Sequence, residues 1–119
     1  MLFPRFRSKE RDLRSDIERL STIYQAVENA IAESERELVG LMNRLDDARS
    51  RAAFLYGDVI DGEIDNDRKS TAIVAEAEGF LVRGERRRGE LDAHFALLRD
   101  LERSLSASIQ ALRDEVAED

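Results

Sequence analysis

The chain has 119 residues, which is enough for one ordinary domain but too few for two domains that each bury their own core. It contains no cysteine and carries a formal net charge of −7, which excludes a disulfide framework and a thiolate metal cage and argues against a broad nucleic-acid-binding surface. More than half of the positions are alanine, glutamate, lysine, leucine or arginine, a composition typical of long helices. No apolar run is long enough to cross a membrane, so we expect a soluble, cytoplasmic protein.

The N-terminal segment MLFPRFRSK mixes Leu2, Phe3 and Phe6 with three basic residues. Such a mixture can contact an anionic membrane surface, so a peripheral membrane protein is one alternative function. Nine residues give only marginal affinity without a second membrane signal. We expect instead a frayed end, or one that packs against the acidic C-terminus.

A long apolar seam follows and predicts one continuous helix over residues ~9–60. The positions reached from Leu13 in alternating steps of four and three residues span almost seven heptads, and only one of them, Ser34, is polar. A 3.5-residue repeat of this length is typical of a coiled coil, in which one narrow stripe faces a partner helix. The seam consists of Leu13, Ile17, Leu20, Tyr24, Val27, Ile31, Ser34, Leu38, Leu41, Leu45, Ala48, Ala52, Leu55 and Val59.

Residues ~61–66 are predicted to form a turn. Gly62 can adopt the left-handed conformation that ends a helix, and Asp65 or Asn66 can cap the start of the next one. The acidic residues of this segment do not match a calcium-binding loop, because Asn66 stands where the sharp turn needs glycine. We therefore expect a solvated turn and no metal or other cofactor.

The repeat resumes in a second helix predicted over residues ~67–117, nearly as long as the first. Two helices of matched length joined by a short turn cover each other's stripes by folding back as an antiparallel hairpin. The fold is therefore predicted to be all-α, with residues 1–119 forming a single helical-hairpin domain. The second seam consists of Val74, Ala77, Leu81, Gly84, Arg88, Leu91, Phe95, Leu98, Glu102, Leu105, Ile109, Leu112 and Val116.

The register of this hairpin follows from the position of the turn. If the turn centres near residue 64, facing residues have numbers that sum to roughly 128. Large side chains then face small ones, as close packing requires. Gly84 falls opposite Leu41 and Leu45, and the pair Ala48 and Ala52 falls opposite Phe80 and Leu81.

Both predicted helices also carry apolar residues beside the seam, and these widen the apolar face beyond what one hairpin covers. We expect a homodimer that forms a four-helix arrangement, or a helical protein partner on the same face. The candidate partner-binding residues of this class are Ile23, Met42, Phe54, Tyr56, Phe80, Leu97 and Leu101, and Val39, Ile60 and Ile73 share the property.

A cluster of arginines, Arg83–Arg88, interrupts the second seam within the stretch GERRRGEL. Arg86 is predicted to point outward, Arg87 to flank the seam, and Arg88 to occupy a core position from which it reaches Glu37 and fixes the register. The alternatives are a docking site for an anionic partner, formed by Arg83, Arg86 and Arg87, and a nucleic-acid contact. The last is disfavoured, because the patch is small and has no aromatic stacking platform beside it.

No catalytic motif is found in the sequence. His94 is the only histidine, and a two-helix rod offers no enclosed cleft around it. We therefore predict a non-enzymatic coiled-coil interaction module, an adaptor, scaffold or assembly or export chaperone. By architecture alone the predicted hairpin is similar to the stalk and chaperone hairpins of bacterial flagellar and type III export systems. The alternative functions are a nucleic-acid-associated regulator that uses Arg83–Arg88 and the peripheral membrane protein described above. The near absence of lysine beside many arginines favours a bacterial source with a GC-rich genome.

Overall fold

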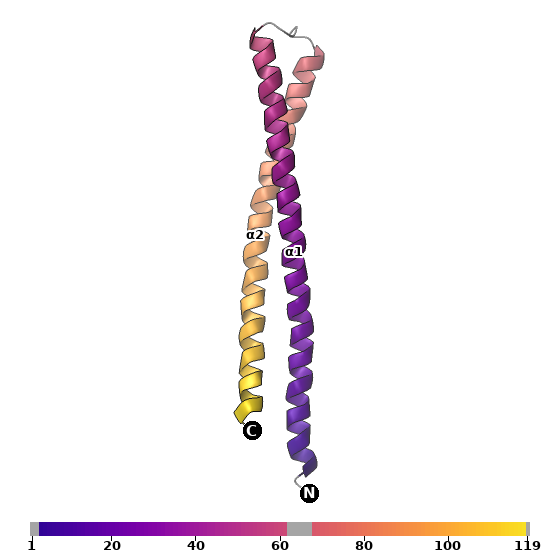
Figure 1. Cartoon of the computed structure of the whole chain (residues 1–119), viewed down its shortest axis with the longest axis vertical. Helices are drawn as coiled ribbons and strands as arrows, with labels where there is room; N and C mark the ends of the chain where they lie inside the picture. Colours follow the sequence, from indigo (N-terminus) through magenta and orange to yellow (C-terminus); the bar gives the residue numbers. More distant parts are fainter. Residues whose placement is uncertain (1–2, 62–67, 119) are drawn as a thin grey trace. The chain divides into compact units, whose positions relative to one another are not determined.

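The structure is a computed structural model that describes residues 3–61 and 68–118, with side chains over residues 9–57 and 71–118. It contains two helices, α1 (Phe3–Asp61) and α2 (Arg68–Glu118), and the described residues form no strand. The helices pack against each other as an antiparallel hairpin (Figure 1). The predicted all-α hairpin is therefore confirmed.

The bounds of the helices differ little from those predicted. α1 begins earlier than residue 9, and Pro4 lies in its first turn. Proline is tolerated there because the amide groups of the first turn have no partner within the helix. α2 matches its predicted bounds to within about one residue. The predicted turn residues Gly62, Asp65 and Asn66 lie outside the described residues.

Burial follows the predicted seam. Every buried side chain among residues 9–57 and 71–118 is a seam residue, and Leu45 and Leu91 are the most completely enclosed. The remaining seam residues of these ranges are half-buried, with the exception of Arg88, which is exposed. The buried set comprises Leu13, Val27, Ile31, Ser34, Leu41, Leu45, Gly84, Leu91, Leu98 and Ile109.

Close packing at Gly84 supports the predicted register. A Cβ atom built on Gly84 would lie 2.2 Å from Cδ2 of Leu45, so the Leu45 side chain occupies the space that any larger residue would need. The two residue numbers sum to about the value of 128 that the sequence predicts. A glycine on one helix thus accommodates a fully buried leucine on the other.

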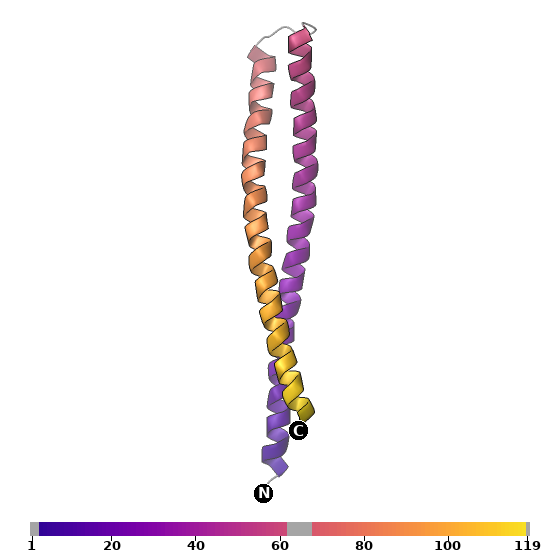
Figure 2. The same ribbon diagram turned by 90° about the vertical axis from the view of Figure 1, so that its left-hand side faces the viewer.

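The chain divides into two compact units, and each contains a segment of both helices. Unit 1 comprises residues 1–33 and 94–119, and unit 2 comprises residues 34–93. Within each unit, the segments of α1 and α2 lie side by side in both views (Figure 2). In unit 1, Val27, Ile31 and Leu98 form a buried cluster with Phe95 and Leu105 packed against it. The prediction that residues 1–119 form one domain stays a prediction.

Candidate interaction surfaces

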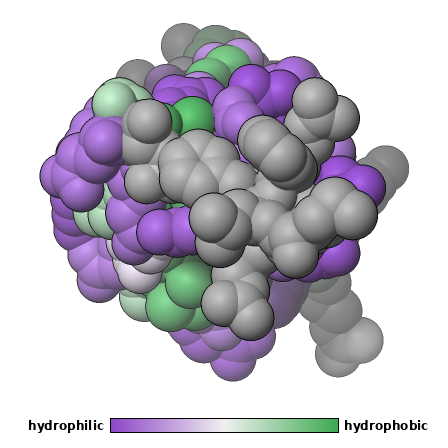
Figure 3. Space-filling view, turned by 90° about the horizontal axis from the view of Figure 1, so that it is seen from below, coloured by the Kyte–Doolittle hydropathy of each residue, from purple (hydrophilic) through white to green (hydrophobic). Residues whose placement is uncertain are grey.

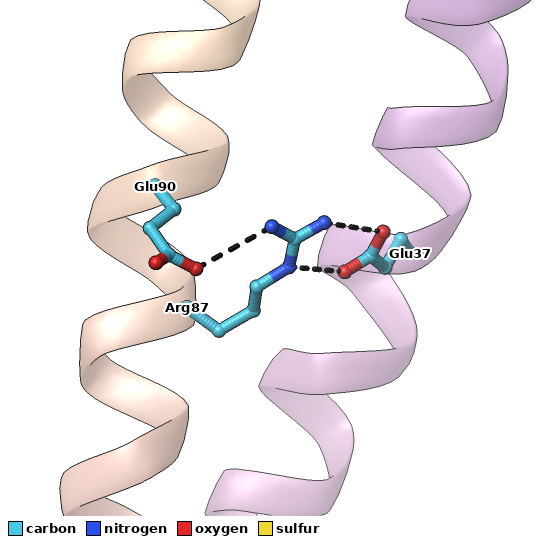
Figure 4. Close-up of polar contacts among 3 residues, drawn as sticks. All are labelled: Glu37, Arg87 and Glu90. Carbon is cyan, nitrogen blue, oxygen red and sulfur yellow. Dashed lines mark hydrogen bonds and ion pairs between the residues drawn. The ribbon is translucent and has the colours of Figure 1, made fainter.

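The arginine cluster of unit 2 contains one arginine that pairs with carboxylates and others that do not. Arg87 donates two hydrogen bonds to Glu37 of the other helix, from Nε to Oε2 at 2.7 Å and from Nη2 to Oε1 at 3.1 Å (Figure 4). Its Nη1 donates to Glu90 Oε1 at 3.4 Å. Arg83, Arg86 and Arg88 are exposed, and no ion pair with a described residue is found for them.

The prediction that Arg88 is the core arginine that reaches Glu37 is wrong. Arg88 is exposed, and Arg87 is the partner of Glu37. A two-helix seam is open on both sides, so a long cation at a seam position can turn its charged end into water. Glu37 and Arg87 are both about half-exposed, so we expect their pairing to contribute little to stability, as is usual for ion pairs in contact with solvent.

The ion pairs between the helices define the two flanks of the seam. With the seam residues as heptad positions a and d, Glu37 and Arg87 both occupy position g, which precedes a. Arg49 and Glu85, which also pair across the helices, both occupy position e, which follows d. The g positions of α1 and α2 therefore share one flank of the seam, together with the neighbouring c positions, and the e and b positions share the other.

The g flank of unit 2 contains a groove of about 410 Å³. Its apolar lining consists of Ala48, Leu55, Ile73, Ala77 and Phe80, and its charged lining of Arg44, Asp47, Arg51, Glu76 and Arg83. Arg51 pairs with Asp47 at 3.4 Å. The groove therefore brings the predicted residues Phe80 and Arg83 together, and the exposed Phe54 lies beside Leu55 and Arg51 in an adjoining hollow.

The arginines Arg44 and Arg83 border this groove without a carboxylate partner among the residues whose side chains are described. Each one folds back over a glycine of its own helix. Nη1 of Arg44 lies 3.4 Å from a Cβ atom built on Gly40, and Nη1 of Arg83 lies 3.3 Å from one built on Gly79. Both charges thus remain available to an acidic group of a partner.

The e flank of unit 2 carries a second set of apolar side chains. Tyr56 is exposed and lines a shallow hollow with Val74 and Leu81, and Met42 is half-buried. Among residues 9–57 and 71–118, Val82 is the most exposed large apolar residue, at 71%, and it was not among the predicted sites. In the sequence Val82 is a single valine at position b, next to the charged Arg83, and it belongs to no periodic apolar stripe.

Unit 1 exposes the three remaining predicted residues, Ile23, Leu97 and Leu101. Ile23 and Leu101 occupy g positions, and Leu97 lies one turn from Leu101 at position c, so all three belong to the g flank of unit 1. Hydrophilic side chains predominate on the coloured surface that Figure 3 shows, and hydrophobic ones form separate small patches.

An acidic cluster spans the seam of unit 1. Glu102 occupies a seam position, and a hydrogen bond with Glu28 raises its pKa, with burial as the second cause. The Arg99 and Arg103 cations oppose this shift. Tyr24 shares the cluster, and its hydrogen bond with Glu28 raises the pKa of its phenol group.

We expect the Glu102→Gln substitution to raise the melting temperature at neutral pH and to have little effect under acidic conditions. Because the pKa of Glu102 is raised on folding, the folded chain binds this proton more tightly than the unfolded chain. The associated stability is present below the ordinary pKa of 4.5 and is lost as the pH rises through the folded value. Thermal melts of both proteins between about pH 4 and pH 8 measure the effect, and a difference in melting temperature that does not change with pH would contradict it.

The described residues contain no candidate metal site and no candidate membrane-spanning helix. Residues 9–57 and 71–118 contain no group of three or more histidine, aspartate or glutamate side chains placed to hold a metal ion. Neither helix, over its described residues, is long and apolar enough to cross a membrane. His94 is exposed on α2. The side chains of the N-terminal segment at residues 1–8, on which the membrane-surface alternative depends, lie outside the described set.

Comparison of the chain with protein-family models, curated proteins and solved structures finds no match.

Proposed function

We propose that the chain is a non-enzymatic helical interaction module, an adaptor, scaffold or assembly chaperone, that binds helices of a protein partner along the flanks of its seam. The observation that carries this proposal is the set of large apolar side chains exposed on both flanks of unit 2. They comprise Val39, Phe54 and Tyr56 on α1 and Ile73 and Val82 on α2.

The geometry of these flanks suits a helix as the partner. An amphipathic helix presents apolar residues every three or four positions and lays this face into a hydrophobic groove. The g-flank groove lies beside the seam and is lined by residues of both α1 and α2. Covering apolar surface of this kind contributes about 25 cal/mol for each Å² removed from water.

Site-specific photocrosslinking in cells tests the proposal. We expect a photoreactive residue at Phe54 or Tyr56 to form adducts with a helical protein, either another protein or a second copy of this chain. The matched control position is Arg36, which is exposed on the same helix of unit 2 but faces away from the seam. Adducts that form equally at all three positions, or at none, would contradict the proposal.

A further inference from the structure

We propose that the e flank of unit 2 binds an amphipathic helix of another protein whose apolar stripe is bordered by lysine or arginine residues. This inference rests on the proposed function, because it assigns one flank of the interaction module to a partner of stated chemistry. The binding surface lies within unit 2 alone and combines exposed apolar side chains with an excess of carboxylates.

Apolar side chains line the e flank from Val39 to Tyr56. These two residues and Val82 are all more than half-exposed, and Met42 lies half-buried on the same flank. Val39 and Tyr56 are separated by about five helical turns, a length of about 25 Å. A helix of this length can cover the stripe by laying its own apolar face upon it.

Carboxylates outnumber cations on this flank. Over the described side chains of unit 2, residues 34–57 and 71–93, the e and b positions hold a single cation, Arg49. Arg49 already pairs with two carboxylates, Asp46 and Glu85. The carboxylates at these positions are all exposed, and they are Glu35, Asp46, Glu78, Glu85 and Asp92. The e flank is therefore acidic.

The g flank of the same unit has no such excess. Over the same residues, its cations are Arg44, Arg51, Arg83 and Arg87, and its carboxylates are Glu37, Asp47, Glu76 and Glu90. The two sets are equal in number, so the g flank is neutral overall. Charge thus distinguishes the two flanks, and it directs a basic partner to the e flank.

The order of the side chains along α2 defines what the partner must present. Glu78, Glu85 and Asp92 follow one another at intervals of seven residues, about 10.5 Å apart along the helix axis. Val82 lies between the first two, one turn from each. A helix packed alongside α2 meets these carboxylates when its lysines or arginines recur every seven residues beside its apolar stripe. Charges at the edge of an apolar contact mainly determine register and partner choice.

A synthetic peptide tests this assignment with the full-length chain. The probe is a helix of about five turns with leucines every three or four residues and lysines every seven residues beside them. We expect fluorescence anisotropy to show that it binds, and that a peptide with glutamates in place of the lysines binds at least about tenfold more weakly. The pair Glu78→Lys and Asp92→Lys should raise the dissociation constant of the lysine peptide at least about tenfold, because like charges then face each other.

The matched control is the pair Glu76→Lys and Glu90→Lys, which makes the same change in net charge at exposed positions on the g flank of the same helix. Salt screens charges that lie away from the contact, so this pair should change the dissociation constant by less than about threefold. Circular dichroism melts show whether each variant remains folded. A lysine peptide that does not bind, or one that both pairs weaken equally, would overturn the inference.

Photocrosslinking from Tyr56 separates failure of this inference from failure of the proposed function. We expect the crosslinked segment to be an amphipathic helix with lysine or arginine beside its apolar stripe. Adducts with an acidic or neutral helix would leave the proposed function standing and reject this partner chemistry. Adducts with a second copy of the chain would likewise reject another protein as the occupant of the e flank.

Discussion

Replacing Leu98 or Leu41 with aspartate is expected to lower the free energy of unfolding by about 3–5 kcal/mol. Both leucines are buried seam residues, Leu98 in the core cluster of unit 1 and Leu41 in unit 2. The introduced carboxylate would be removed from water, and the apolar contacts of the leucine would be lost. Urea titrations followed by circular dichroism at neutral pH measure the change.

The matched control is Arg86→Ala, which removes an exposed side chain from the same hairpin. We expect it to change the free energy of unfolding by less than about 0.5 kcal/mol. Comparable losses of stability in all three variants would mean that the seam is misplaced. No effect at Leu98 would mean that the core cluster of unit 1 is misplaced.

The fold was predictable because one periodic signal specifies most of it. A 3.5-residue repeat determines which face of each helix is buried, and the near-equal lengths of the two repeats require an antiparallel return. The register was also predictable, since Gly84 and Leu45 are the small and large members of one packing layer. Over the residues with described side chains, the repeat assigned burial correctly at every seam position except Arg88.

The error at Arg88 has a physical cause. A heptad position specifies where a Cα atom lies, but a long side chain can leave a two-helix seam that is open on both sides. Glu37 then pairs with Arg87, because both residues occupy g positions and g positions face each other in an antiparallel pair. The pairing of g positions in antiparallel coiled coils therefore indicates Arg87, and not Arg88, as the partner of Glu37.

The individual residues of the candidate surfaces could be predicted from the sequence, but their grouping into one site could not. The sequence identified Phe54 and Phe80 as apolar residues beside the seam and Arg83 as a member of the arginine cluster, but it did not group them. Their grouping with Arg44 around one groove depends on which residues of α2 lie beside which residues of α1. The absence of carboxylate partners for Arg44 and Arg83 in the described residues likewise depends on side-chain positions that no periodicity specifies.

Replacing Gly84 with alanine is expected to lower the free energy of unfolding by about 1–3 kcal/mol, the range typical of overpacked cores. The new Cβ atom would lie 2.2 Å from Cδ2 and 3.1 Å from Cγ of Leu45, and Leu45 has no exposed surface into which it can retreat. In an unhindered helix the same substitution stabilises by about 0.5–1 kcal/mol. Gly89 provides that comparison, since no atom lies within 4 Å of a Cβ atom built there, and Gly89→Ala should raise stability.

Combining Gly84→Ala with Leu45→Ala separates steric conflict from any other effect of the alanine. Leu45→Ala alone should cost about 2–5 kcal/mol, because it leaves a cavity in the seam. In the double variant the methyl group introduced at Gly84 enters that cavity and meets no leucine. The double variant should therefore lose less free energy of unfolding than the two single variants lose together. The difference should exceed about 1 kcal/mol, the coupling expected of residues in direct contact. Additive losses in urea titrations of the four proteins would show that Gly84 and Leu45 do not share a packing layer, and the register would then have to be assigned anew.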